Sequence, residues 1–163
     1  MLNYNPALPK ETLFQDLQMK EISPIMKLIV RGKKREFISA VGRSLNILLP
    51  TEANTSTQSD KLTALWLSPD EWMIFSNHTM SKDLNDYETE KLLQNNISKN
   101  NLGAVTNVTD QFVMINLKGN KIYELFQSGS PFNFNNFQNK KGATTQTIFG
   151  KIDIIVHNQH KNA

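Results

Sequence analysis

The sequence contains no cysteine among its 163 residues. It therefore has no disulfide framework, no thiolate metal ligand and no cysteine nucleophile, which leaves oxygen and imidazole groups for metal binding or covalent chemistry. The seven glycines are scattered and form neither the G-x-G-x-x-G fingerprint of dinucleotide-binding folds nor a phosphate-binding P-loop. No serine stands in a G-x-S-x-G motif. These absences exclude thiol enzymes and argue against nucleotide binding and serine-based catalysis.

Long hydrophobic runs are also missing. No window approaches the roughly 20 apolar residues that a membrane-spanning helix requires. The start of the sequence, MLNYNPALPKETLFQ, has no basic segment followed by an apolar stretch, as a secretory signal would. We therefore expect a soluble, cytoplasmic chain with no membrane partner.

Neither the basic nor the acidic residues are concentrated in one long run of the sequence. Eighteen basic and 15 acidic residues give a net charge of +3, and the densest basic group is Arg31, Lys33, Lys34 and Arg35. A solvated turn at the start of a helix is the simplest interpretation of that group, and an acidic partner or a phosphate-bearing ligand is the alternative. No nucleic-acid partner is expected, because the remaining basic residues form no stripe.

The segment Ala64–Ser76, ALWLSPDEWMIFS, contains both tryptophans and predicts a largely buried β-hairpin. A proline and an aspartate supply its turn. Asp70 and Glu71 do not read as a catalytic carboxylate pair, because adjacent residues of a strand point to opposite faces. Trp66 and Trp72 are expected to bury against helices or against a partner subunit.

The pattern along the chain predicts an α+β protein. Residues 1–22 read as an N-terminal arm with one short helix around Glu11–Met19, and residues 23–163 read as a single domain with halves at about 23–109 and 110–158. The first half has the order β-α-β-β-α-β, which is typical of a ferredoxin-like unit with its helices on one face of an antiparallel sheet.

The same pattern begins again in the second half. The segments LIVRGKKREFISAVG, residues 28–42, and INLKGNKIYELFQSG, residues 115–129, share a basic-glycine turn, apolar helix positions and a closing glycine. A second predicted hairpin, Thr145–His157, stands where the tryptophan hairpin stood. A helix and a strand should follow it, but only NQHKNA remains. The second unit is therefore incomplete, and either the sequence is truncated or a partner completes the sheet by strand addition.

Few side chains indicate chemistry. His157 and His160 lie at a strand end and in the terminal tail without a carboxylate cluster, so no metal site is predicted, and no catalytic residue is assigned. Two loops carry hydrogen-bonding groups: residues 49–55, and residues 108–111 with Asp110. An ordinary crossover loop and a structural cap are the simpler interpretations of the two loops, and a ligand or subunit contact is the alternative. The asparagine-rich run PFNFNNF, residues 131–137, indicates compositional bias rather than a binding site.

These segments together resemble the gamma subunit of heterotetrameric sarcosine oxidase, which is itself similar to the folate-binding T protein of the glycine cleavage system. The resemblance spans residues 24–157. It departs at Ser130, where the family commonly has cysteine, and in the short sequence after the last hairpin. The matching residues are Leu28–Gly32, Leu48–Asn54, Ala64–Phe75, Val108–Gln111, Gly129–Pro131 and Gln146–Thr147.

The resemblance implies tandem ferredoxin-like units, as in the N-terminal fold of the T protein. It further implies a noncatalytic assembly subunit of a flavin enzyme that demethylates sarcosine to glycine, with tetrahydrofolate as the one-carbon acceptor. The expected partners are the alpha, beta and delta subunits. These would hold FAD, FMN, NAD and tetrahydrofolate, and this chain would bind none of them. Trp66, Trp72, Pro50, Asn54 and Pro131 are then subunit-interface or structural residues.

Two alternatives follow from the same features. A free folate-binding or aminomethyltransferase-like protein would use Glu52 and Asp110, whose carboxylates can accept hydrogen bonds from pterin nitrogens. A basic RNA-binding module also has the order β-α-β-β-α-β. The chain lacks the aromatic motif of such modules, because Arg31-Gly32 is followed by Lys33-Lys34.

Overall fold

The computed structural model describes residues 5–8, 11–22, 24–79 and 86–159. The chain divides into two compact units, which are considered separately. One, here called the inserted unit, is the contiguous segment Ile25–Phe112, and the other, the split unit, combines Met1–Pro24 with Val113–Ala163. No helix formed by the described residues has the length and apolar character that crossing a membrane requires.

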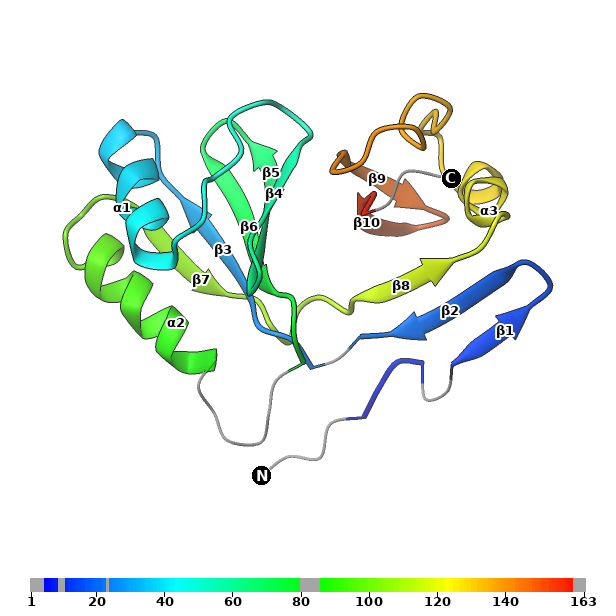
Figure 1. Ribbon diagram of the computed structural model, residues 1–163, viewed down its shortest axis with the longest axis horizontal. Helices are drawn as coiled ribbons and strands as arrows, with labels where there is room; N and C mark the ends of the chain where they lie inside the picture. The colour runs from blue at the N-terminus through cyan, green and yellow to red at the C-terminus, as the bar shows by residue number, and fades with distance from the viewer. Residues whose placement is uncertain (1–4, 9–10, 23, 80–85, 160–163) are drawn as a thin grey trace. The chain divides into compact units, whose positions relative to one another are not determined.

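The inserted unit is a five-stranded antiparallel sheet in the order β4-β5-β6-β3-β7. Figure 1 shows α1 and α2 on the same face of this sheet. Apart from β4, which is an additional edge strand, the expected order β-α-β-β-α-β is confirmed. The elements are β3 (Lys27–Arg31), α1 (Arg35–Leu45), β4 (Ser56–Gln58), β5 (Leu62–Ser68), β6 (Glu71–Ser76), α2 (Asp86–Leu93), the π-helical turn η1 (Gln94–Ser98) and β7 (Ala104–Asn107).

The core of the inserted unit is the helix-facing stripe of β3 and β6. Leu28 is the cross-strand partner of Ile74, and Val30 is the partner of Trp72. All four side chains are at most 1% exposed, as is Phe37 of α1. Burial of each such side chain is worth about 1.5–3 kcal/mol. Leu65, Leu67, Met73 and Phe75, on the other face of the hairpin, are also buried, so the prediction of a largely buried hairpin is confirmed.

A glycine is required where the chain enters β7. A Cβ atom on Gly103 would lie 2.2 Å from the carbonyl oxygen of Arg31 and 2.7 Å from the ring of Phe37. The first distance is to backbone that cannot move away without breaking the β3–β7 pairing. The residue at position 103 is therefore fixed by the close approach of β7 to β3.

The split unit contains a three-stranded sheet in the order β1-β2-β8 and a separate hairpin of β9 and β10. The expectation of a short helix over Glu11–Met19 is wrong, because this segment forms the β1–β2 hairpin. Asp16 in its turn has a φ of 60°, a left-handed conformation that is incompatible with a continuous helix. The elements are β1 (Thr12–Phe14), β2 (Leu17–Glu21), β8 (Ile115–Lys118), α3 (Ile122–Gly129), β9 (Thr144–Phe149) and β10 (Ile152–His157).

The second half of the chain repeats the order of the first but not its single sheet. Its elements β8, α3, β9 and β10 follow the expected order β-α-β-β. Within the described residues, however, β8 pairs with β2 from the N-terminal segment, and no ladder joins it to the β9–β10 hairpin. The expected last helix and strand would begin at the end of the sequence, where residues 160–163 lie outside the described part.

Aromatic rings form the core of the split unit. Phe134 is fully buried and stacks on Phe126 of α3, with 4.9 Å between the ring centroids. Phe132 meets Phe134 edge-on at 4.8 Å, and Phe137 is 6% exposed. The interpretation of residues 131–137, which rested on their asparagines, did not predict this phenylalanine core. Since the phenylalanines supply this core, the asparagines between them serve as polar loop residues.

Asn158 organises the loop that returns from this cluster. Its Nδ2 lies within hydrogen-bond distance of the carbonyl oxygens of Phe137, Gln138 and Lys140, at 3.0–3.1 Å. The residue is 8% exposed. A buried amide that serves several main-chain carbonyls replaces the water that these groups would otherwise bind.

Asn158→Asp should destabilise the protein, because a carboxylate of the same shape would face these carbonyl oxygens without a donor. We expect a loss of at least about 2 kcal/mol in the free energy of unfolding, measured by urea denaturation at pH 7. Asn136→Asp, an exposed change in the same segment, is the matched control. Equal effects of the two substitutions would contradict this role.

Candidate functional site

Trp72 joins the loop after α1 to the sheet. Its Nε1 donates a hydrogen bond of 2.7 Å to the carbonyl oxygen of Pro50, and its ring centroid lies 5.8 Å from that of Phe37. Trp72 and Pro50 are both buried. Trp66, the cross-strand partner of Trp72, is half-buried against the same core. Trp72, Pro50 and Trp66, which the sequence predicts to be interface or structural residues, therefore all make contacts within this chain.

The acidic turn of the tryptophan hairpin is occupied by local interactions. Arg31 pairs with Asp70 at 3.9 Å and with Glu71 at 3.8 Å. The Ser68 hydroxyl donates to the Asp70 carboxylate at 2.9 Å, and the N–H of Gly32 donates to the Asp70 carbonyl at 3.0 Å. Such exposed ion pairs contribute about 0–1 kcal/mol each. The two acids thus stabilise the turn, and their arrangement offers no shared position for a substrate.

The two candidate cofactor carboxylates do not come together. Glu52 is exposed in the loop before β4, and Asp110 is exposed after β7. Strands β4 and β7 are the two opposite edges of the sheet, so four strand spacings, or about 19 Å, separate them. No hydrogen bond or ion pair of either carboxylate occurs among the described residues. They therefore do not form a joint pterin-binding site.

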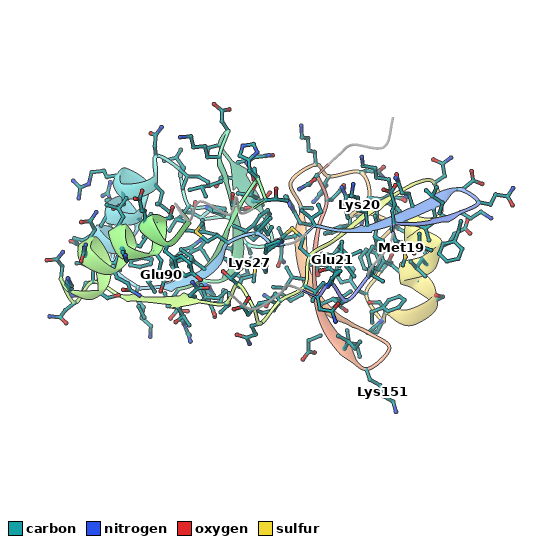
Figure 2. All side chains as sticks on the ribbon, turned by 90° about the horizontal axis from the view of Figure 1, so that it is seen from below. Met19, Lys20, Glu21, Lys27, Glu90 and Lys151 are labelled. Carbon is teal, nitrogen blue, oxygen red and sulfur yellow. The ribbon has the colours of Figure 1, made fainter. Side chains whose placement is uncertain are left out.

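The cap expected at Asp110 is made by its neighbours. The Oγ1 of Thr109 accepts a hydrogen bond of 3.1 Å from the N–H of Lys27, and the Oδ1 of Asn107 accepts one of 3.0 Å from the N–H of Thr109. The Nδ2 of Asn107 also donates to the carboxylate of Glu90 on α2 at 2.6 Å. Lys27 and Glu90 are labelled in Figure 2. Two residues that precede Asp110 in the sequence, Asn107 and Thr109, thus supply the structural role.

The remaining predicted interface residues lie at the surface. Asn54 is exposed with a φ of 60°, in a turn closed by a 2.7 Å bond from the Thr55 hydroxyl to the carbonyl of Glu52. Pro131 is exposed directly after α3. Ser130 and Thr147 belong to two of the segments that carry the family resemblance, Gly129–Pro131 and Gln146–Thr147. The structure brings these segments together, because the two hydroxyls are 3.1 Å apart.

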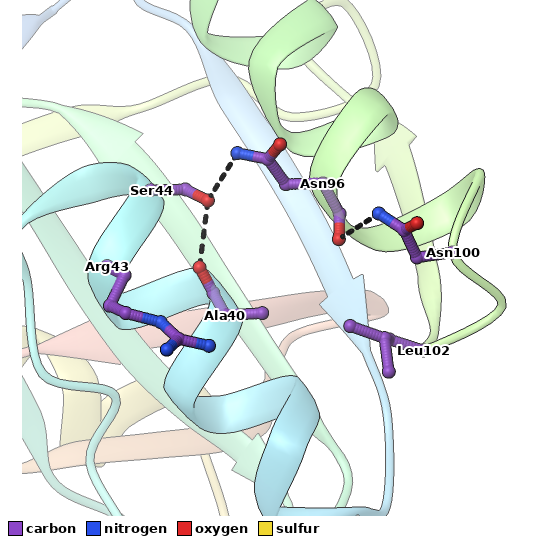
Figure 3. Close-up of a pocket in the computed structure, with 6 residues that line it drawn as sticks. All are labelled: Ala40, Arg43, Ser44, Asn96, Asn100 and Leu102. Atoms are coloured by element: carbon purple, nitrogen blue, oxygen red, sulfur yellow. Dashed lines mark hydrogen bonds between the residues drawn. The ribbon is translucent and has the colours of Figure 1, made fainter.

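A shallow cavity of about 350 Å³ lies between α1 and η1. Figure 3 shows that its polar groups bond to one another. Asn96 donates to the Ser44 hydroxyl at 2.9 Å, and Ser44 donates to the Ala40 carbonyl at 2.8 Å. Asn100 donates to the carbonyls at the start of the same turn. With Arg43 as its one charged lining residue, the cavity contains neither an acid nor a nucleophile paired with a base.

No group of three or more potential metal ligands occurs among the described residues. His157 lies at the end of β10 and is partly buried, and burial lowers its pKa to about 4. His160, the other histidine of the C-terminal segment, lies outside the described residues. His157 is therefore a neutral imidazole at pH 7.

The described part of the chain is thus an α+β protein in which Arg31, Asp70 and Glu71 stabilise a turn and Trp72 belongs to the core. The sequence matches the sarcosine oxidase, gamma subunit family over residues 31–163, and the chain belongs to this family. No curated protein matches the sequence.

A solved structure supports the fold. The chain is similar to a chain of the heterotetrameric sarcosine oxidase from Corynebacterium sp. U-96 in complex with pyrrole 2-carboxylate, with a TM-score of 0.76 and 14% sequence identity. The match covers 89% of this chain and 71% of that chain. At this identity the similarity establishes the α+β fold.

Trp72→Ala should destabilise the protein by about 3–5 kcal/mol, because it removes a fully buried ring. Trp72→Phe should cost less, about 1–3 kcal/mol, since it keeps most of the burial and removes the donor to the Pro50 carbonyl. Chemical denaturation of both variants measures this difference. A Trp72→Ala protein as stable as the wild type would contradict the structural assignment.

Protonation of His157 should destabilise the native state below neutral pH. The unfolded chain binds a proton near pH 6.5, whereas the native imidazole binds one only near pH 4. The free energy of unfolding should therefore fall as the pH drops from about 6.5 to about 4, and should be unaffected by this group above that range.

Denaturation curves collected across this pH range test the assignment. His157→Gln should reduce the dependence of stability on pH, while His78→Gln, at an exposed position, is the matched control. An unchanged pH dependence in His157→Gln would contradict the burial of this imidazole.

Proposed function

We propose that this chain is a noncatalytic assembly subunit of a heterotetrameric, flavin-dependent sarcosine oxidase. In such a complex it would stabilise the alpha, beta and delta subunits while these demethylate sarcosine to glycine, with tetrahydrofolate accepting the one-carbon unit. Membership of the gamma subunit family carries this proposal. The cytoplasm is the expected location of the complex.

The chemistry of the described residues supports a structural role. The acids of the tryptophan hairpin pair with Arg31, and the indole N–H of Trp72 binds the Pro50 carbonyl. FAD, FMN, NAD and tetrahydrofolate are accordingly expected on the other subunits. Trp66, Trp72 and Pro50 would act through the stability of the inserted unit, whereas the exposed Asn54 and Pro131 are available for subunit contacts.

The two alternative functions receive less support. A free folate-binding protein would need its carboxylates to converge, whereas Glu52 and Asp110 stand at opposite edges of the sheet. An RNA-recognition module stacks bases on exposed aromatic rings of its central strands. The aromatic residues of the central strand β6, Trp72 and Phe75, are 1% and 3% exposed.

Co-expression with the alpha, beta and delta subunits tests the proposed function. We expect the four chains to co-purify and oxidise sarcosine, and omission of this chain to lower the yield of assembled complex. The combined variant Glu52→Gln, Asp110→Asn should leave turnover per assembled complex unchanged, because neither carboxylate has a catalytic role. Full assembly and activity without this chain would contradict the proposal.

Titration calorimetry of the isolated chain with tetrahydrofolate distinguishes the proposed assembly subunit from a free folate-binding protein. We expect no binding heat. Heat that disappears in Asp110→Asn would instead favour a folate-binding protein.

A further inference from the structure

Strand β8 uses only one of its two edges within the described residues. The N–H of Ile22 donates a 2.8 Å bond to the carbonyl of Met114, and the β2–β8 register continues from this pair. Because hydrogen-bonded pairs alternate in an antiparallel ladder, Asn116 and Lys118 also turn their backbone groups toward β2. Ile115 and Leu117 turn theirs toward the opposite edge, where no other described strand pairs with β8.

Strand β3 of the inserted unit, which aligns with β8, shows which neighbouring strand is missing at this edge. In the alignment of residues 28–42 with 115–129, Met114 corresponds to Lys27. The Lys27 carbonyl accepts a 2.9 Å bond from the N–H of Val108, which follows β7, just as the Met114 carbonyl accepts from Ile22, which follows β2. Strand β2 therefore takes the position beside β8 that β7 takes beside β3. On β3 the opposite edge is covered by β6.

The open edge of β8 is largely apolar and carries little of the usual protection against pairing. The segment Val113–Leu117, VMINL, contains no charged residue or proline, and the one charge of β8 is at its last residue, Lys118. Val113 and Ile115 are 52% and 45% exposed. Exposed edges normally carry charge, proline or a bulge that prevents pairing with another chain. The edge strands β4 (STQ) and β7 (AVTN) of the inserted unit are more polar. A largely apolar edge with a single terminal charge is the kind of edge that a partner strand can cover.

The distribution of apolar side chains points to the same unit. Of the 21 buried hydrophobic residues in the described part of the chain, only Phe134 and Phe137 belong to the split unit. Among the nine exposed large hydrophobic residues of the same described part, six belong to the split unit: Leu13, Phe14, Val113, Ile115, Ile148 and Ile152. The split unit thus has a small core of its own and apolar surface to bury against another protein.

We propose that the open edge of β8 receives an extended apolar segment of a partner subunit of the sarcosine oxidase complex, which adds to the β1-β2-β8 sheet as a fourth strand. Main-chain groups of Ile115 and Leu117 bind this segment, and Val113 and Ile115 pack against its side chains. The inference rests on the proposed function. A partner subunit is favoured over a second copy because the family is defined by its place in a complex of different subunits.

Leu117→Pro tests the edge directly. It removes the N–H that points away from β2 while keeping the bonds of Asn116 and Lys118, and proline is tolerated where a strand's N–H faces outward. We expect the thermal midpoint of the free chain to stay within about 2 °C of the wild type. The amount of chain that co-purifies with alpha, beta and delta should fall at least about tenfold. Ile115→Lys, which adds an edge charge, should have the same effect.

Asn116→Pro is the matched control, because it removes a bond to β2 and should destabilise the free chain. Wild-type levels of assembly in both Leu117→Pro and Ile115→Lys would overturn the proposal. If both free variants lose stability, the chain's own residues cover this edge. If the wild-type chain forms a dimer that the two substitutions dissociate, a second copy covers it. Either result would also overturn the proposal. Failure of the wild-type chain itself to co-purify would instead contradict the proposed function.

Discussion

The pairing of β3 with β7 is the constraint on which the rest of the fold depends. It places the Lys27 carbonyl 2.9 Å from the Val108 nitrogen, so the two ends of the inserted unit meet. Glu21 and Ile115 are cross-strand partners in the split unit, and the whole of the inserted unit lies between them in the sequence. Closing so long a loop costs conformational entropy. Once β3 and β7 have paired, only the short segments on either side remain to be closed, and β2 can pair with β8.

The two units differ in how much apolar surface they bury. The inserted unit has a large core, in which Trp72, Phe37 and the stripe on β3 pack together, and its conspicuous acids and asparagines form turns and caps. The split unit has an aromatic cluster around Phe134 and an open apolar strand edge at Ile115. A unit with a large core joined to a unit with a small one is the arrangement expected of a subunit whose second unit is completed by assembly.

Residue patterns predicted the inserted unit well because its alternation of apolar residues coincides with its burial. They failed at Glu11–Met19, where the left-handed conformation of Asp16 produces a hairpin, and at residues 131–137, where asparagines obscured the phenylalanine core. Pairing of β8 with β2 was not predictable, since no local pattern identifies a strand partner on the far side of an inserted unit. Among the site residues, the sequence identified both Trp72 and Pro50 but not the hydrogen bond between them, and it placed at Asp110 a cap that Asn107 and Thr109 make.

Amide hydrogen exchange of the free chain and of the assembled complex tests the central claim most directly. If the chain is an assembly subunit that docks through its split unit, exchange of the Ile115 and Leu117 amides, which face the open edge, should slow markedly in the complex. The amides of Leu28 and Val30, already paired within the inserted unit, should change little. Equal exchange of the Ile115 and Leu117 amides in the two samples, with protection confined to the loops that carry Glu52 and Asp110, would contradict this account.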